Sequence, residues 1–130
     1  MKFMGLDYGA KRIGVAVSDA GGSIAFPRAV VPNNSSLLEE VRRIAAEESV
    51  ERIVVGDTRS HGGAKNPVTD DAERFITELR AAGLPVEAAF EAWSSIEASR
   101  YAPKGMEHDD AAAAAVILQR YLDMHAGGVR

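Results

Sequence analysis

Cysteine is absent from the 130-residue chain, which excludes disulfide bonds and thiolate metal sites. Also absent are an apolar run long enough to cross a bilayer and the pattern of an N-terminal signal peptide. These absences predict a cytoplasmic protein that makes no contact with a membrane. Positive charge is not in excess either, because 15 Lys and Arg stand against 19 Asp and Glu, for a net charge of -4. The chain is therefore no general polyanion binder. Any contact with nucleic acid would need a local basic patch, or metal ions that offset acidic side chains.

Apolar material is plentiful. Hydrophobic residues make up 46% of the chain and charged residues 26%, as expected of a globular protein with a real core. The length suits one domain, so we expect residues 1–130 to form a single unit.

Three strands are predicted at the start of the chain. They cover residues 2–7, 11–18 and 23–31, with short turns between them. The Gly pair before the third strand marks a hairpin turn, and Pro27 within it indicates an edge strand or a bulge. Strands joined by such tight turns must be antiparallel neighbours.

Helices and strands alternate in the remainder. Ser35 or Ser36 can cap a first helix, and Asn66 with Pro67 marks the start of a second one that Gly83 ends. Two further strands are expected at residues 51–57 and 84–90, a short helical piece at about 94–101, and a last helix at 110–123. Strands reached through a helix should be parallel by right-handed crossover. The expected fold class is therefore α/β, with a mixed five-stranded sheet and helices on its faces.

Carboxylates stand at three places that such a sheet could bring together. Asp7 ends the first strand, Glu91 follows the fifth, and Asp109 and Asp110 start the last helix. Converging carboxylates repel one another unless a cation lies between them. Mg²⁺ or Mn²⁺ suits oxygen ligands and could promote phosphodiester hydrolysis. Plainer readings stay open: Asp7 as a turn residue, and either aspartate as a helix cap.

Basic residues lie close to the first carboxylate. Lys11 and Arg12 follow the turn after Asp7 and could hold a phosphate, although a hairpin tip is often basic for solubility alone. The Gly-rich loop 57–66 adds Arg59 and Lys65. This loop could close over a strand of nucleic acid or be a plain connection.

The motifs "GLDYGAKRIGVAVSD", "RIVVGD…GG" and "DDAAAAAVILQRYLD" resemble those of the YqgF-type family. Its members are described as Holliday junction resolvases or pre-16S rRNA nucleases with an RNase H-like fold. The resemblance implies that Asp7, Glu91 and Asp110 bind Mg²⁺ or Mn²⁺ and act in catalysis. It selects Asp110 over Asp109 by its distance from Gln119, and it implies three antiparallel strands followed by two parallel ones.

The segment "FEAWSS" departs from the family pattern. Glu91 matches the family's glutamate, but Phe90 replaces an acidic residue and Ala92 an arginine. Asp57 also adds a charge after the fourth strand, where the family usually has Gly-Leu-Pro.

Three functions follow as hypotheses. The first is a metal-dependent endonuclease, a monomer or homodimer, that acts on structured RNA such as precursor rRNA or on branched DNA. The second is a nucleic-acid-binding or regulatory module with a weakened site, suggested by Phe90 and Ala92. The third, a nucleotide phosphotransferase of the actin type, fits poorly because that architecture needs two such domains.

Overall fold

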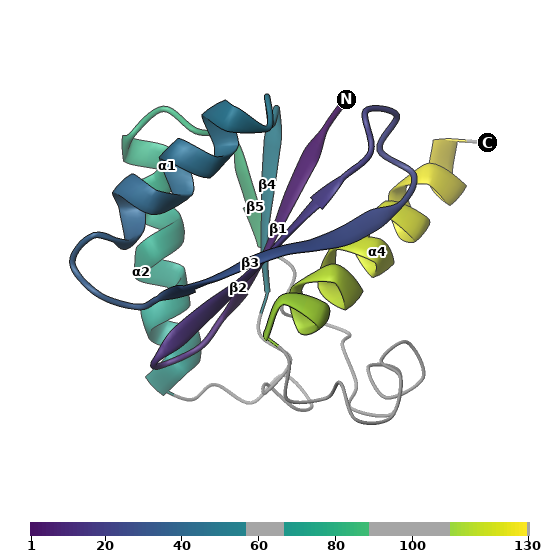
Figure 1. The fold of residues 1–130 in the computed structure, drawn as a ribbon. Coiled ribbons are helices and arrows are strands. Elements are labelled where there is room, and N and C mark those ends of the chain that lie inside the picture. Colours follow the sequence, from purple (N-terminus) through teal and green to yellow (C-terminus); the bar gives the residue numbers. More distant parts are fainter. Residues whose placement is uncertain (57–66, 89–109, 130) are drawn as a thin grey trace.

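The computed structural model describes residues 1–56, 67–88 and 110–129 (Figure 1). Within them, the chain forms β1 (Phe3–Tyr8), β2 (Arg12–Ser18), β3 (Ala25–Pro32), α1 (Leu37–Glu47), β4 (Arg52–Gly56), α2 (Pro67–Ala81), β5 (Val86–Ala88) and α4 (Asp110–Val129). The expected helical piece at 94–101 and the cap at Asp109 lie outside the described residues. No described helix is both long and apolar enough to cross a membrane.

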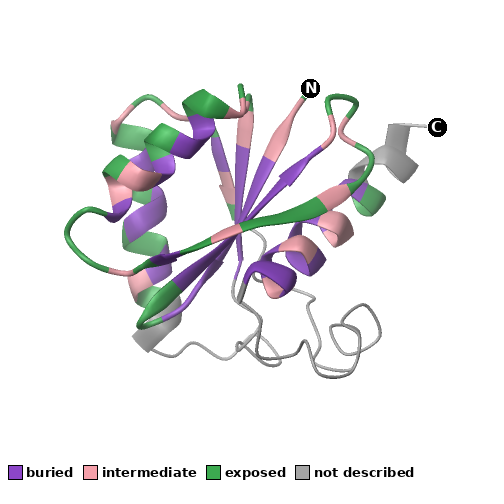
Figure 2. Ribbon diagram, viewed as in Figure 1, coloured by how far each residue is buried: buried purple, intermediate pink, exposed green. Residues whose placement is uncertain are grey.

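The five described strands form one sheet in the order β3-β2-β1-β4-β5. Strands β1, β2 and β3 pair antiparallel, whereas β4 is parallel to β1 and β5 is parallel to β4. This confirms the predicted mixed sheet. Strand β1 lies in the centre, with neighbours on both sides, which explains why its side chains are buried almost throughout (Figure 2).

Two of the predicted strands begin two residues too early, and the other three begin one residue too early. The third was expected at 23–31, but the N–H groups of Ser23 and Ile24 donate to the Asp19 carboxylate in the hairpin turn instead. The fifth was expected at 84–90, but the N–H of Leu84 donates to the carbonyl of Leu79 at the end of α2. In both cases a local turn takes the backbone donor that a sheet ladder would need.

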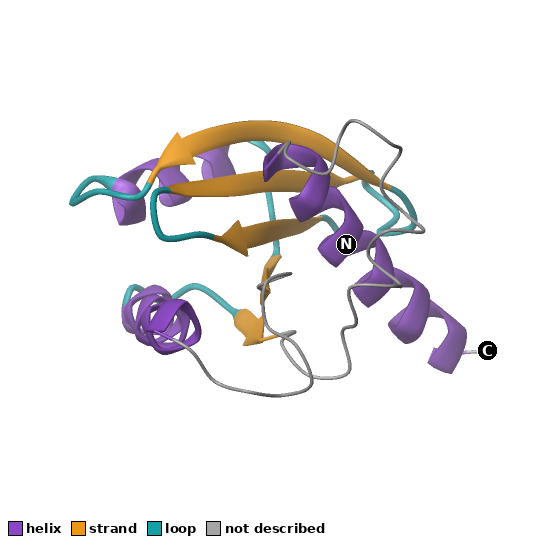
Figure 3. Ribbon diagram, turned by 90° about the horizontal axis from the view of Figure 1, so that it is seen from below, coloured by secondary structure: helices purple, strands orange, loops and turns teal. Residues whose placement is uncertain are grey.

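The alternation of side chains along β1 divides the core into two layers. Met4, Leu6 and Tyr8 point to the face covered by α1 and α2. Residues at the odd positions point to the other face, which α4 covers across β1, β2 and β3 (Figure 3). The prediction of helices on both faces is thus confirmed.

Helix α4 packs unusually close to β1 at Gly5. A Cβ atom at Gly5 would lie 2.6 Å from the Cβ of Leu118 and 3.1 Å from the carbonyl oxygen of Ala114. Only a residue without a side chain fits here. The alanines of α4 serve the same close contact, because small side chains let the helix backbone approach the sheet.

The start of α1 differs in detail from the prediction. Ser36 occupies the N-cap position, yet its side chain makes no capping hydrogen bond. The Asn34 side chain accepts from the Ser36 N–H at 2.9 Å, and the Asn34 carbonyl accepts from the Leu37 N–H. Asparagine is as good an acceptor as serine in such turns. Asn34, two residues before Ser36, therefore accepts the hydrogen bonds at the start of α1. Helix α2 begins at Pro67 and is followed by Gly83, whose φ is +87°, as predicted.

We predict that Gly5→Ala destabilises the protein by about 1–3 kcal/mol, the usual cost of overpacking a core. Denaturant unfolding followed by circular dichroism would measure the change. Gly21→Ala is the matched control, because a Cβ there meets nothing closer than 3.6 Å. Equal stability of the two variants would contradict the close packing of α4.

Candidate active site

Asp7 is a buried carboxylate near the end of β1, with only 2% of its surface exposed. It pairs with Gly14 of β2 and with Gly56 of β4. Paired residues point to the same face of a sheet, so Asp7 lies on the α4 side between two positions that have no side chain. Neither strand partner therefore presents a side chain to the carboxylate.

The contacts between β1 and α4 place Asp7 beside the first turn of that helix. The Phe3 ring lies 5.7 Å from the Tyr121 ring, and Gly5 faces Leu118 and Ala114. Each step of two residues along β1 therefore moves about one turn towards the start of α4. The next step brings Asp7 to the turn that begins with Asp110.

Not every predicted ligand can be located. The backbone of Asp110 starts α4 next to Asp7, but the Asp110 side chain and the whole of Glu91 lie outside the described residues. Among the described side chains, no three His, Cys, Asp or Glu are grouped so that they could share a metal ion. The three-carboxylate site therefore stays a prediction, with Asp7 as its described member.

The two basic residues after Asp7 are exposed at the same end of the sheet. Arg12 opens β2 and shares the face of Gly14, which is also the face of Asp7. Lys11 lies in the turn between β1 and β2. Asn33 bonds to this turn twice: the Asn33 N–H donates to the Lys11 carbonyl, and the Asn33 Nδ2 donates to the Gly9 carbonyl, both at 2.9 Å. The predicted contacts Arg59 and Lys65 lie outside the described residues.

A polar cluster behind the site joins α4 to the parallel half of the sheet. The Tyr121 hydroxyl donates to Glu87 of β5, and Arg52 of β4 forms an ion pair with Glu87 at 3.0 Å. Burial of the hydroxyl and its bond to Glu87 raise the pKa of Tyr121 to about 12. Sequence reasoning missed this cluster, because its three residues are far apart in the chain and only the tertiary fold brings them together.

A second missed contact joins α4 to the β2–β3 hairpin. Gln119 accepts from the Ala25 N–H and donates to the Ser23 carbonyl, each at 2.9 Å. The motif residue Gln119 therefore has a structural role that the motif alone did not reveal. Together with Tyr121 it fixes the position of α4, and hence of the first turn beside Asp7.

A family model described as RuvX, Holliday junction resolvase, matches residues 1–124. This chain belongs to the RuvX family. A "Putative pre-16S rRNA nuclease" of Nitratidesulfovibrio vulgaris is 43% identical over 101 residues, which cover 75% of this chain and 71% of the relative. A protein of the same name from Chlorobium luteolum is 38% identical over 137 residues, covering 97% and 96%. RuvX membership confirms the predicted family and the predicted reaction class: a hydrolase of phosphodiester bonds in nucleic acid.

Solved structures confirm the RNase H-like fold. Thermus thermophilus RuvC in complex with a Holliday junction substrate has a TM-score of 0.62 at 15% identity, covering 98% of this chain and 96% of RuvC. The fowlpox virus Holliday junction resolvase has a TM-score of 0.57 at 11% identity, covering 96% and 99%. At such low identity the likeness concerns the fold alone.

We predict that Tyr121→Phe lowers the free energy of unfolding by about 1.5–3 kcal/mol, the usual value of a hydrogen bond to a charged group. Glu87→Gln keeps an acceptor for the hydroxyl and should cost less. Urea unfolding of both variants at neutral pH would measure the difference. If Tyr121→Phe has the same free energy of unfolding as the wild type, the hydroxyl contributes nothing to stability.

The raised pKa of Tyr121 also predicts a loss of stability in alkali. Because the folded state holds this proton more tightly, the contribution is complete below the ordinary value of 10.0 and is lost as the pH rises through about 12. The difference between the ultraviolet titrations of the wild type and Tyr121→Phe should therefore show one phenol that ionises near pH 12. Ionisation near pH 10 would contradict the buried bond.

Proposed function

We propose that this RuvX protein is a metal-dependent endonuclease that trims structured RNA, most directly the 5′ end of pre-16S rRNA in the cytoplasm. The observation that carries this proposal is the buried Asp7, placed between two glycines beside the start of α4. The names of the relatives support the RNA substrate.

The donor set fits a hard divalent cation. Asp7 offers carboxylate oxygens, the ligands that Mg²⁺ and Mn²⁺ prefer, and its strand partners Gly14 and Gly56 present no side chain to it. Glu91 and Asp110 would complete the ligands. When bound, the ions would activate water and stabilise the leaving oxygen.

Lys11 and Arg12 would position the substrate. Both are exposed, and Arg12 lies on the same face of the sheet as Asp7. Their charges would hold backbone phosphates without reading the bases. Such contacts give a nuclease of net acidic charge the local positive surface that it needs for RNA.

A second candidate is the resolution of Holliday junctions, which the description of the family favours. Cutting a junction symmetrically would call for a homodimer that presents two sites, whereas RNA trimming is possible for a monomer. Cleavage of a pre-16S rRNA fragment and of a four-way DNA junction, compared in one buffer, would decide between the two substrates.

We predict that Asp7→Asn abolishes cleavage in Mn²⁺. Removing an outer-shell partner of a metal site can lower the activity roughly 100-fold, and losing a direct ligand should lower the cleavage rate further. The fold should persist, because asparagine has nearly the same shape. Asp19→Asn is the matched control, since Asp19 serves the hairpin turn and should leave the rate unchanged. Full activity of Asp7→Asn would refute a metal site that depends on Asp7.

We further predict that Arg12→Gln weakens RNA binding and lowers the slope of log affinity against log salt by about one. Arg43→Gln is the control, because Arg43 lies on α1, on the sheet face opposite to Asp7, where it forms ion pairs with Glu40 and Glu47. Binding would be measured by fluorescence anisotropy at several salt concentrations. Equal slopes for the two variants would remove Arg12 from the phosphate contacts.

A further inference from the structure

The turn between β1 and β2 carries the two basic residues that are proposed to hold the substrate. The ladder between the two strands ends before residues 9–12, which connect them. Lys11 and Arg12 are exposed in this connection, whereas Gly9 at its start is buried. An exposed turn can take several shapes unless other parts of the chain hold it. The arrangement of the two cations near Asp7 therefore depends on what holds the turn.

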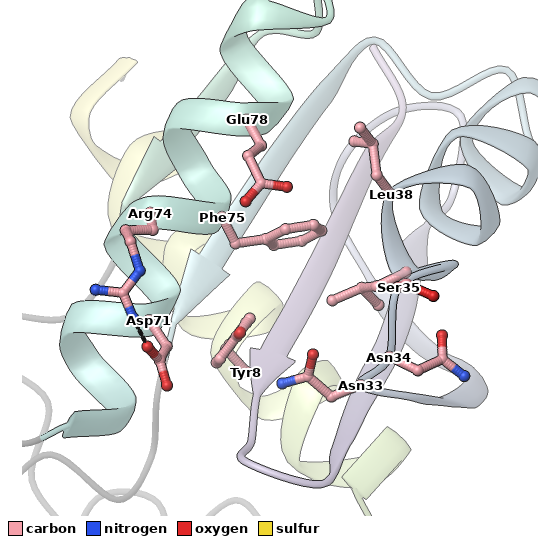
Figure 4. A pocket seen from close by; sticks show the side chains of 10 residues that line it. Tyr8, Asn33, Asn34, Ser35, Leu38, Asp71, Arg74, Phe75 and Glu78 are labelled. Carbon is pink, nitrogen blue, oxygen red and sulfur yellow. Dashed lines mark ion pairs between the residues drawn. The ribbon is translucent and has the colours of Figure 1, made fainter.

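Asn33 bonds to this turn from the end of β3. Pro32, the last residue of β3, pairs with Arg12 of β2. Asn33 comes next, and its N–H donates to the Lys11 carbonyl at 2.9 Å, which extends the contact between the two strands by one residue. The side chain reaches farther, because Nδ2 donates to the Gly9 carbonyl, also at 2.9 Å. Figure 4 looks into a pocket that Asn33 lines and shows its amide nitrogen directed towards the end of β1.

The side-chain bond is specific to an amide donor. Gly9 is buried, so its carbonyl needs a partner within the protein. Alanine at position 33 would remove the Nδ2 donor without adding a charge, and the backbone N–H could still donate to the Lys11 carbonyl. The substitution Asn33→Ala therefore releases the turn at Gly9 and leaves the strand contact in place.

The neighbouring asparagine has a different role. The Asn34 Oδ1 accepts from the Ser36 N–H at 2.9 Å, and the Asn34 carbonyl accepts from the Leu37 N–H at 3.0 Å. Asn34 thus serves the start of α1, while Asn33 serves the turn. Variants of the two residues separate an effect on the turn from a general effect on this part of the chain.

We infer that Asn33 is a positioning residue for substrate binding: its side chain holds the turn so that Lys11 and Arg12 meet the phosphates in a fixed arrangement. The inference rests on the proposed nuclease function. Cations that are already held in place lose little freedom when a phosphate binds, whereas cations on a loose turn must first be ordered by the substrate. Asn33 therefore acts on affinity and not on the chemistry at Asp7.

The first measurement needs no substrate. Backbone order parameters from ¹⁵N relaxation should be roughly 0.8 for residues 10–12 of the wild type and should fall below about 0.6 in Asn33→Ala. In Asn34→Ala they should stay at the wild-type values, because Asn34 bonds to α1. Unchanged order parameters in Asn33→Ala would overturn the proposal, since the turn would then be held without this side chain.

The second measurement is the affinity for a fluorescent pre-16S rRNA fragment, by anisotropy, in Asp7→Asn protein that does not cut the probe. Adding Asn33→Ala should weaken binding roughly three- to tenfold, the cost of ordering a side chain only when the substrate binds. Asn34→Ala should leave the affinity unchanged. In protein that also carries Lys11→Gln and Arg12→Gln, Asn33→Ala should have no further effect, because it acts through these two cations.

Cleavage by protein with Asp7 intact completes the test. Asn33→Ala should raise KM by the same factor and leave kcat within about twofold of the wild type. An unchanged affinity, a loss of affinity that persists without Lys11 and Arg12, or a fall in kcat at constant KM would each overturn the proposal. If the wild type binds the RNA but does not cut it, the nuclease function fails, and the affinities still decide whether Asn33 positions the two cations.

Discussion

The close approach of α4 to the central strand β1 is the contact on which the rest of the site depends. Gly5 permits it, since any side chain there would collide with Leu118 and Ala114. A helix held farther from the sheet would carry its first turn away from Asp7. Gln119 and Tyr121, which lie in the same turn of α4, then fix the helix in place. Gln119 bonds to the β2–β3 hairpin, and Tyr121 bonds to Glu87 of β5. Packing, and not the carboxylates themselves, therefore sets the geometry in which catalytic groups can meet.

The end of β1 contributes side chains to both faces of the sheet. Asp7 and Tyr8 are neighbours in the chain, yet the pleat of β1 sends one towards α4 and the other towards α1 and α2. The turn after them carries Lys11 and Arg12 at the edge that both faces share. One strand end thus contributes to two chemically distinct surfaces.

Local patterns in the sequence predicted the succession of strands and helices along the chain, the start of α2 at Pro67 and the glycine that follows its end. They work because strand alternation, capping and left-handed turns depend on adjacent residues. The cluster of Arg52, Glu87 and Tyr121 could not be predicted, since it joins residues that only the tertiary fold brings together. The strand limits at Ala25 and Val86 were misjudged because turn hydrogen bonds competed for the same N–H groups.

Strand β3, at the edge of the sheet, has a consequence for assembly. It exposes Phe26 and Val30, at 48% and 44%, and it contains Pro27 and Pro32. A proline at a sheet edge removes an N–H that would face solvent, so the outer row of donors is interrupted. Another chain can hardly extend the sheet from this side by strand pairing. Contact between two copies at this edge would therefore rest on side chains and not on strand pairing.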